Sequence, residues 1–253
     1  MKTNPVIETQ NNHVTVRLFT NDSVDDEMLD SILEAGRRAP TSSNMQAYSV
    51  IVVRDPVVKK QLAVVAGNQK HVETCPVFLA FCADVNRLEK TCSMHDVEMK
   101  NNLETFLIST IDASLVGMSV QTAVESFGLG AVMIGAMRNN PKEAGKLLGL
   151  PKGVYVVFGM CIGWPNKSEI PPQKPRLPKE LVIHGEKYCN ENVDEQIEEY
   201  DRVLAKHYEL QGKNISASAW SGPVARNLGK ILRPENISLL SEMGFDICRG
   251  RET

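Results

Sequence analysis

Three short stretches of the sequence combine side chains that suit the binding of an anion or another polar ligand. The first is HVTVR, which begins at His13. Side chains alternate along an extended chain, so His13, Thr15 and Arg17 face one side and the two valines between them face the other. An imidazole, a hydroxyl and a guanidinium on one side predict a cradle for phosphate, with an ordinary exposed edge strand as the alternative.

The second stretch is QKPRLP, residues 173–178. Lys174 and Arg176 are two residues apart in a segment stiffened by proline, so both cations can face the same anion. Because proline restricts the chain before binding, less entropy is lost when such a clamp closes. The alternative is a solvated linker in which the two basic residues occur by chance.

The third stretch is the loop TSSNMQ, residues 41–46, directly before the apolar run Tyr48–Val53. Short helix-to-strand loops usually need one or two turn residues, whereas this one presents hydroxyl and amide groups at almost every position. Either the loop satisfies its own backbone, or it is shaped to hydrogen-bond something that is not protein.

Other motifs are weaker. Gly135 ends a predicted strand, where a ligand can approach the backbone closely, although simple turn geometry explains it too. GLG at residues 128–130 lacks the later glycine of the dinucleotide-binding pattern. Gln69 and Lys70 lie in a polar loop. The five histidines are scattered, so the sequence predicts neither a catalytic triad nor a metal site.

The elements that must position these residues follow from periodicity and capping signals. Ser23 with Asp26, and Asn140 with Glu143, resemble capping boxes at two helix starts. About four strands predict a mixed α and β domain, too small for a full two-half dinucleotide fold. The predicted elements are helices at 23–38, 56–65, 102–127 and 191–211, strands at 48–53, 77–83 and 154–162, a further strand and helix within 128–151, and one or two short helices within 213–253.

The helix predicted over residues 102–127 is apolar on more than one face. Such a helix is buried on more than one side, so it is either the core helix of the domain or part of a subunit interface. Asp112 and Glu125 argue against a membrane span. Five prolines between residues 165 and 178 predict an extended arm rather than a flexible linker.

The composition narrows the class of protein. The 253-residue chain carries 28 Lys and Arg against 31 Asp and Glu, a net charge of −3, which is not the electrostatic footprint of nucleic-acid binding. None of the six cysteines is spaced as CxxC, the N-terminus shows no leader pattern, and no apolar run reaches about 18 residues. We expect a soluble, cytoplasmic protein with reduced thiols and no membrane segment.

Seven segments, taken together in order and spacing, resemble the nitroreductase family of FMN enzymes, in particular its oxygen-insensitive NADPH nitroreductases and flavin reductases. They are HVTVRLFT, RRAPTSSNMQAYSVIVV, GNQKH, ESFGLGAVMIGAMRNNP, LGLP, VFGMCIGWP and KPRLP, within roughly residues 6–240. The resemblance implies an α+β homodimer with a central mixed, mainly antiparallel sheet flanked by helices and a long buried core helix. It also implies one domain over 1–253, with 165–253 as an extended arm and C-terminal helical excursion.

The resemblance further implies a set of FMN contacts. In chain order these are His13, Thr15 and Arg17 at the phosphate and flavin, Thr41, Ser42, Ser43 and Gln46 reaching the flavin of the partner subunit, Gln69 near the pyrimidine edge, Ile134 and Gly135 beside flavin N5, and Lys174 and Arg176 as a phosphate clamp. The polar loop would then be shaped for a ligand across a dimer interface.

The sequence departs from the family pattern in several places. Val14 stands where the family commonly has arginine, Met133 where an aromatic residue often precedes the Ile-Gly pair, and Ala136 where a second glycine is usual. The loop QGKNISASAWS, residues 211–221, carries only one basic residue, Lys213. Lys213 is therefore the candidate for holding a nicotinamide 2′-phosphate, and the preference between NADPH and NADH stays open because arginine forks hold that group best.

The implied function is that of an FMN-dependent NAD(P)H oxidoreductase. A reduced nicotinamide gives hydride to flavin N5, leaves, and is replaced by a small-molecule acceptor such as a nitroaromatic, a quinone or free flavin. Because the hydride chemistry belongs to the cofactor, we expect no essential acid or base side chain. The alternatives are a flavin-binding sensor or carrier that is not a reductase, and an FMN enzyme with another redox substrate.

Overall fold

The computed structural model describes residues 2–215 and 217–248. The chain divides into two compact units, one formed by Met1–Pro171 with Glu235–Thr253 and the other by Pro172–Pro234. Each unit is described here by itself. The single domain expected over residues 1–253 stays a prediction, and the last five residues of the charged tail lie outside the described residues.

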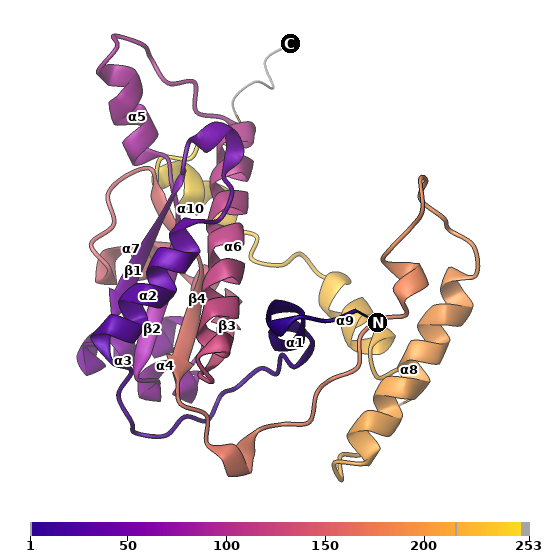
Figure 1. The fold of residues 1–253 in the computed structure, drawn as a ribbon. Coiled ribbons are helices and arrows are strands. Elements are labelled where there is room, and N and C mark those ends of the chain that lie inside the picture. The colour runs from indigo at the N-terminus through magenta and orange to yellow at the C-terminus, as the bar shows by residue number, and fades with distance from the viewer. Residues whose placement is uncertain (1, 216, 249–253) are drawn as a thin grey trace. The chain divides into compact units, whose positions relative to one another are not determined.

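The first unit is built on a four-stranded sheet in the order β1-β2-β4-β3, in which every neighbouring pair is antiparallel (Figure 1). An isolated parallel bridge between Thr15 and Ala131 makes the sheet mixed. The predicted strands are confirmed, and two of them extend one residue further than expected. The strands are β1 (Tyr48–Val53), β2 (Val77–Asp84), β3 (Gly130–Ile134) and β4 (Val154–Gly163).

Helices cover both faces of this sheet. Along β2 the side chains alternate between two apolar clusters, with Leu79 and Phe81 in one and Phe78 and Ala80 in the other. Because both faces are covered, β2 and β4 are apolar throughout. The helices of this unit are α1 (Pro5–Asn11), α2 (Asp26–Arg37), α3 (Pro56–Val65), α4 (Lys70–Thr74), α5 (Asn86–Ser93), α6 (Leu103–Ser126), α7 (Pro141–Leu147) and α10 (Asn236–Glu242).

One predicted cap is wrong and another is confirmed. Helix α2 begins after Asp25, whose carboxylate accepts a hydrogen bond from the backbone N–H of Glu27. Ser23 therefore does not cap it, since the aspartate directly before the first helical residue satisfies a free N–H instead. In α7, by contrast, the Asn140 side chain accepts from the backbone N–H of Glu143, as predicted.

The longest helix, α6, is the core helix of the first unit. It packs against α2 and β2 and buries the polar side chains of Ser109, Asp112 and Gln121. By length and composition it is the one described helix that could also cross a membrane. It leaves an apolar stripe uncovered, with side chains 39% to 54% exposed, made of Leu103, Leu107, Ile111, Leu115 and Met118. The core-helix interpretation is confirmed, and a subunit interface on the uncovered stripe stays a prediction.

The second unit has its own small apolar core. Helix α8 (Val193–Glu209) buries Tyr200 and Leu204 against the segment that leads into α9 (Ser221–Leu228). The Asp201 carboxylate accepts hydrogen bonds from the backbone N–H groups of Trp220 and Ser221, at 2.6 and 2.9 Å, and so fixes the start of α9. The helix predicted over 191–211 is confirmed, two residues shorter at each end.

Candidate functional site

Alternate side chains of the HVTVR stretch line one hollow, which is called the cradle below. The backbone N–H of Val16 donates to the carbonyl of Ala131, 3.0 Å away, so the stretch lies along β3. Val16 is buried, whereas His13, Thr15 and Arg17 line one hollow of about 240 Å³ together with the exposed Met133. The predicted alternation is confirmed, and an imidazole, a guanidinium and a hydroxyl line one space.

The carboxylate of Glu125, which the sequence did not assign to this site, contacts His13. The imidazole Nδ1 lies 2.5 Å from Glu125 Oε1, and the Gln121 amide nitrogen donates to the same oxygen at 3.2 Å. Glu125 and Gln121 are one turn apart on α6, so both reach His13 from the same side. Glu125 and Gln121 thus both contact the imidazole at Nδ1. No local signal marks the pair of His13 and Glu125, since 112 residues separate its members.

The polar loop is fastened from beneath by Asp112 of α6. One carboxylate oxygen accepts from the backbone N–H of Ser42 and the other from that of Ala47, both at 3.0 Å. Asp112 is 1% exposed, whereas Ser42 and Ser43 are exposed. Asp112 thus satisfies two backbone N–H groups of the loop, while Ser42 and Ser43 stay accessible to solvent or a ligand.

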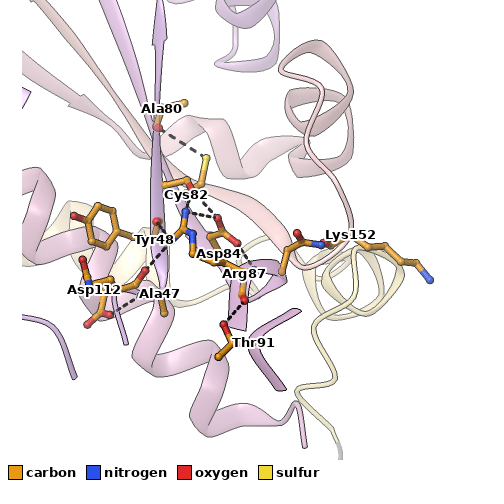
Figure 2. Close-up of polar contacts among 12 residues, drawn as sticks. Ala47, Tyr48, Ala80, Cys82, Asp84, Arg87, Thr91, Asp112 and Lys152 are labelled. Carbon is orange, nitrogen blue, oxygen red and sulfur yellow. Dashed lines mark hydrogen bonds and ion pairs between the residues drawn. The ribbon is translucent and has the colours of Figure 1, made fainter. Parts of the chain in front are cut away.

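Arg87 holds the other end of the same loop (Figure 2). Its Nη1 donates to the carbonyls of Gln46 and Tyr48, at 3.0 and 3.2 Å, and its Nη2 contacts the Asp84 carboxylate at 3.2 Å. Between these supports the backbone is left-handed at Ser43, Asn44 and Gln46, with φ between 49° and 57°. Non-glycine residues adopt that region only where their surroundings impose it.

The Ile134–Gly135 segment borders the cradle through Met133. Ile134 is buried, and a Cβ added to Gly135 would lie 3.3 Å from Arg138 Nη2. Arg138 itself donates to the Val157 carbonyl at 2.5 Å. A side chain at position 135 would therefore require Arg138 to shift slightly, a constraint that sequence reasoning did not anticipate.

The Gln69 segment leads into helix α4. Gln69 precedes α4 and is half-buried, and its side chain does not cap the helix. Burial lowers the pKa of the neighbouring His71, and the positive charge of Arg17 lowers that pKa further. The predicted place of Gln69 near a pyrimidine edge stays a prediction.

The second unit places its candidate cations around two tyrosines. The Tyr200 hydroxyl donates to the Pro175 carbonyl at 2.9 Å and so fastens the segment between Lys174 and Arg176 to α8. Burial raises the pKa of Tyr200, and the charges of Arg176 and Lys174 oppose that rise. Both cations are thus near enough to Tyr200 to influence its pKa, and their role as a phosphate clamp stays a prediction.

Lys213 has cationic neighbours that the sequence did not assign to it. It lines a hollow of about 670 Å³ with Arg202 and Lys206, which lie one turn apart on α8. Arg202 also pairs with Glu199 at 2.8 Å. The sequence shows that Arg202 and Lys206 are one helical turn apart. It does not show that both lie near the loop after α8. No cluster of metal-ligating side chains is found among the residues that the structure describes.

The sequence of this chain matches known proteins over nearly its whole length. The profile described as nitroreductase family matches residues 11–164, and the profile described as nitroreductase family, C-terminal domain, matches residues 174–248. The chain belongs to the nitroreductase family. The family resemblance and the fold class inferred from the sequence are thereby confirmed.

Two relatives and one solved structure show how similar this chain is to other members of the family in sequence and fold. It is 37% identical over 242 residues to the oxygen-insensitive NADPH nitroreductase of Salmonella typhimurium, covering 95% of this chain and 98% of that protein. It is 37% identical over 248 residues to an FMN reductase [NAD(P)H] of Bacillus subtilis, covering 96% and 99%. The structure of NfrA2 from B. megaterium superposes with a TM-score of 0.92 at 34% identity, covering 97% and 99%.

Proposed function

We propose that this protein is an FMN-dependent NAD(P)H oxidoreductase that passes two electrons to nitroaromatics, quinones or free flavin. The observation that carries the proposal is the convergence of His13, Thr15 and Arg17 on one hollow beside the Ile134–Gly135 segment. A hydroxyl and two nitrogen donors suit a phosphate group, and the exposed Met133 offers an apolar edge for a ring. Full-length relatives named NADPH nitroreductase and FMN reductase support the same conclusion.

The side chains of this protein would bind and orient the cofactor. When bound, FMN supplies the hydride chemistry of the reaction. Arg17, Thr15 and His13 would contact its phosphate and flavin, with Glu125 keeping the imidazole oriented. Gln69 would face the pyrimidine edge and the Ile134–Gly135 backbone the ring. We assign no acid or base side chain to the reaction, since binding and orientation are what the protein adds.

We further propose that the protein is a cytoplasmic homodimer. The apolar stripe of α6 would pack against a second copy of the chain, because a contiguous uncovered apolar face on a core helix suits an interface. The loop of Thr41, Ser42, Ser43 and Gln46 would then serve the flavin of the partner subunit. Six free cysteines agree with a reducing compartment.

The proposed function has a direct test. The purified protein should be yellow with FMN-like absorbance, should bleach on anaerobic addition of NADPH or NADH, and should regain its colour when a quinone is added. A yellow protein that neither nicotinamide bleaches would instead be a flavin-binding sensor or carrier. Bleaching without turnover of any quinone, nitroaromatic or flavin in a substrate panel would point to another redox substrate.

The predicted phosphate clamp can be tested by Arg176→Ala. Loss of one or two charge-assisted hydrogen bonds, about 1.5–3 kcal/mol each, should weaken FMN binding about tenfold or more. Riboflavin, which lacks the phosphate, should bind almost as before. Titration by quenching of flavin fluorescence measures both affinities. Arg54→Ala, which removes a cation paired with Asp26 elsewhere, is the matched control. Equal losses for both flavins would contradict the clamp.

The choice of nicotinamide can be tested by Lys213→Ala. Lysine is a point charge on a flexible stem and discriminates less than an arginine fork, so we expect both cofactors to be used. Their kcat/KM values should differ by less than about a hundredfold, or about 2.7 kcal/mol. Lys213→Ala should reduce any preference for NADPH and leave NADH turnover nearly unchanged in steady-state kinetics. An undiminished preference would assign the phosphate to Arg202 or Lys206 instead.

A further inference from the structure

Two lysines with different predicted roles lie against one aromatic ring of the second unit. Lys174 Nζ and Lys213 Nζ are each 5.6 Å from the centroid of the Tyr208 ring. A cation within about 6 Å of a ring centroid is attracted by the negative face of the ring. Tyr208 is half-buried at the end of α8, where it packs on the core formed by Tyr200, Leu204 and Ala219.

We propose that Tyr208 is a positioning residue that serves both phosphate-binding lysines at once. Resting on the proposed function, this makes flavin phosphate binding through Lys174 and 2′-phosphate recognition through Lys213 depend on a single side chain. The ligands concerned are a flavin mononucleotide and an adenine nucleotide with a 2′-phosphate.

The turn after α8 explains how Lys213 reaches this ring. The Tyr208 carbonyl accepts hydrogen bonds from the backbone N–H groups of Gln211 and Lys213, both at 3.0 Å. Gly212 has φ 70°, the left-handed conformation that lets the chain reverse at the end of a helix. Lys213 therefore returns over the last turn of its own helix, and its Nζ also donates to Gln211 Oε1 at 3.0 Å.

A separate contact explains how Lys174 reaches the same ring. Tyr200 lies two turns before Tyr208 on the apolar face of α8, is 6% exposed, and donates to the Pro175 carbonyl. Arg176 Nη1 in turn donates to the Lys174 carbonyl at 3.4 Å. The proline-stiffened segment is thus anchored at its centre, which limits where the Lys174 side chain can go.

The ring favours one position for each of the two flexible side chains. Each ammonium group lies 5.6 Å from the ring centroid and is attracted by the negative face of the ring. The same ring thus holds two like charges near each other. Without the ring, both lysines should spend less time in the position that receives a phosphate.

The test compares Tyr208→Leu, which removes the ring, with Tyr208→Phe, which keeps it. The full chain is titrated with FMN and riboflavin by flavin fluorescence, and the holoenzyme with adenosine 2′,5′-bisphosphate and adenosine 5′-monophosphate by calorimetry. We expect Tyr208→Leu to weaken FMN and the bisphosphate about two- to fivefold each, with riboflavin and the monophosphate unchanged. Tyr208→Phe should behave as wild type, and Tyr208→Leu should add little to Lys213→Ala for the bisphosphate.

The outcomes separate the inference from the function on which it rests. A purely structural role for Tyr208 would weaken all four ligands alike and would overturn the inference. So would a Tyr208→Leu variant that binds FMN and the bisphosphate as tightly as wild type. A wild-type protein that binds neither FMN nor the bisphosphate would overturn the proposed function, and the inference with it.

Discussion

An Asp112→Ala variant is expected to lose about 2–4 kcal/mol of folding free energy and most of its flavin affinity. The Asp112 carboxylate is buried and accepts from two backbone N–H groups of the polar loop. Hydrogen bonds to a charged group contribute about 1.5–3 kcal/mol each, although Ser42 is exposed and its N–H can turn to water. Ala47 is 0% exposed and its N–H would have no partner.

The loss of flavin affinity follows from the strained backbone of the loop. Three non-glycine residues with positive φ are held between Asp112 and Arg87, and without Asp112 the loop is free to relax. Its hydroxyl and amide groups would then no longer be presented in one arrangement. Denaturant unfolding and flavin titration measure both effects.

A matched control shows what a surface carboxylate contributes. Asp26→Ala removes a 91% exposed carboxylate that pairs with Arg54, and exposed pairs contribute about 0–1 kcal/mol. If Asp112→Ala were as stable as Asp26→Ala, the loop would not depend on Asp112. If stability fell and flavin affinity did not, the loop would have no part in the flavin site.

An Ile111→Asp variant is expected to be a folded monomer without bound flavin. Ile111 lies in the middle of the apolar stripe and is 54% exposed in the single chain, so an aspartate there stays solvated when the chain is alone. In a dimer built on this stripe the charge would be buried on both copies, which should weaken association about a hundredfold or more.

Light scattering and absorbance test this expectation together. The wild type should scatter as a dimer of twice the 28.0 kDa chain, and Ile111→Asp as a monomer with unchanged circular dichroism. Val64→Asp, at a 62% exposed position on α3, is the control and should stay dimeric and yellow. A monomeric wild type that keeps FMN and full activity would contradict both the interface and the loop's predicted role.

The sequence by itself determined the features that depend on near neighbours along the chain. Strand β1 and helix α3 have the predicted bounds, because an apolar run, an aspartate cap and a proline act within a few residues. The common side of His13, Thr15 and Arg17 follows from the two-residue repeat of an extended chain. The family resemblance likewise rested on short motifs in a fixed order.

The tertiary structure alone decided which distant groups support those motifs. Asp112 lies 65 residues from Ala47 in sequence, and Glu125 lies 112 residues from His13. The sequence showed the acidic residues only as interruptions of an apolar helix. Backbone hydrogen bonds of a loop must be satisfied somewhere, but no local pattern says where. The tertiary fold determines these hydrogen-bond partners. Packing of α6 against the sheet brings its polar side chains under the loop and beside the cradle.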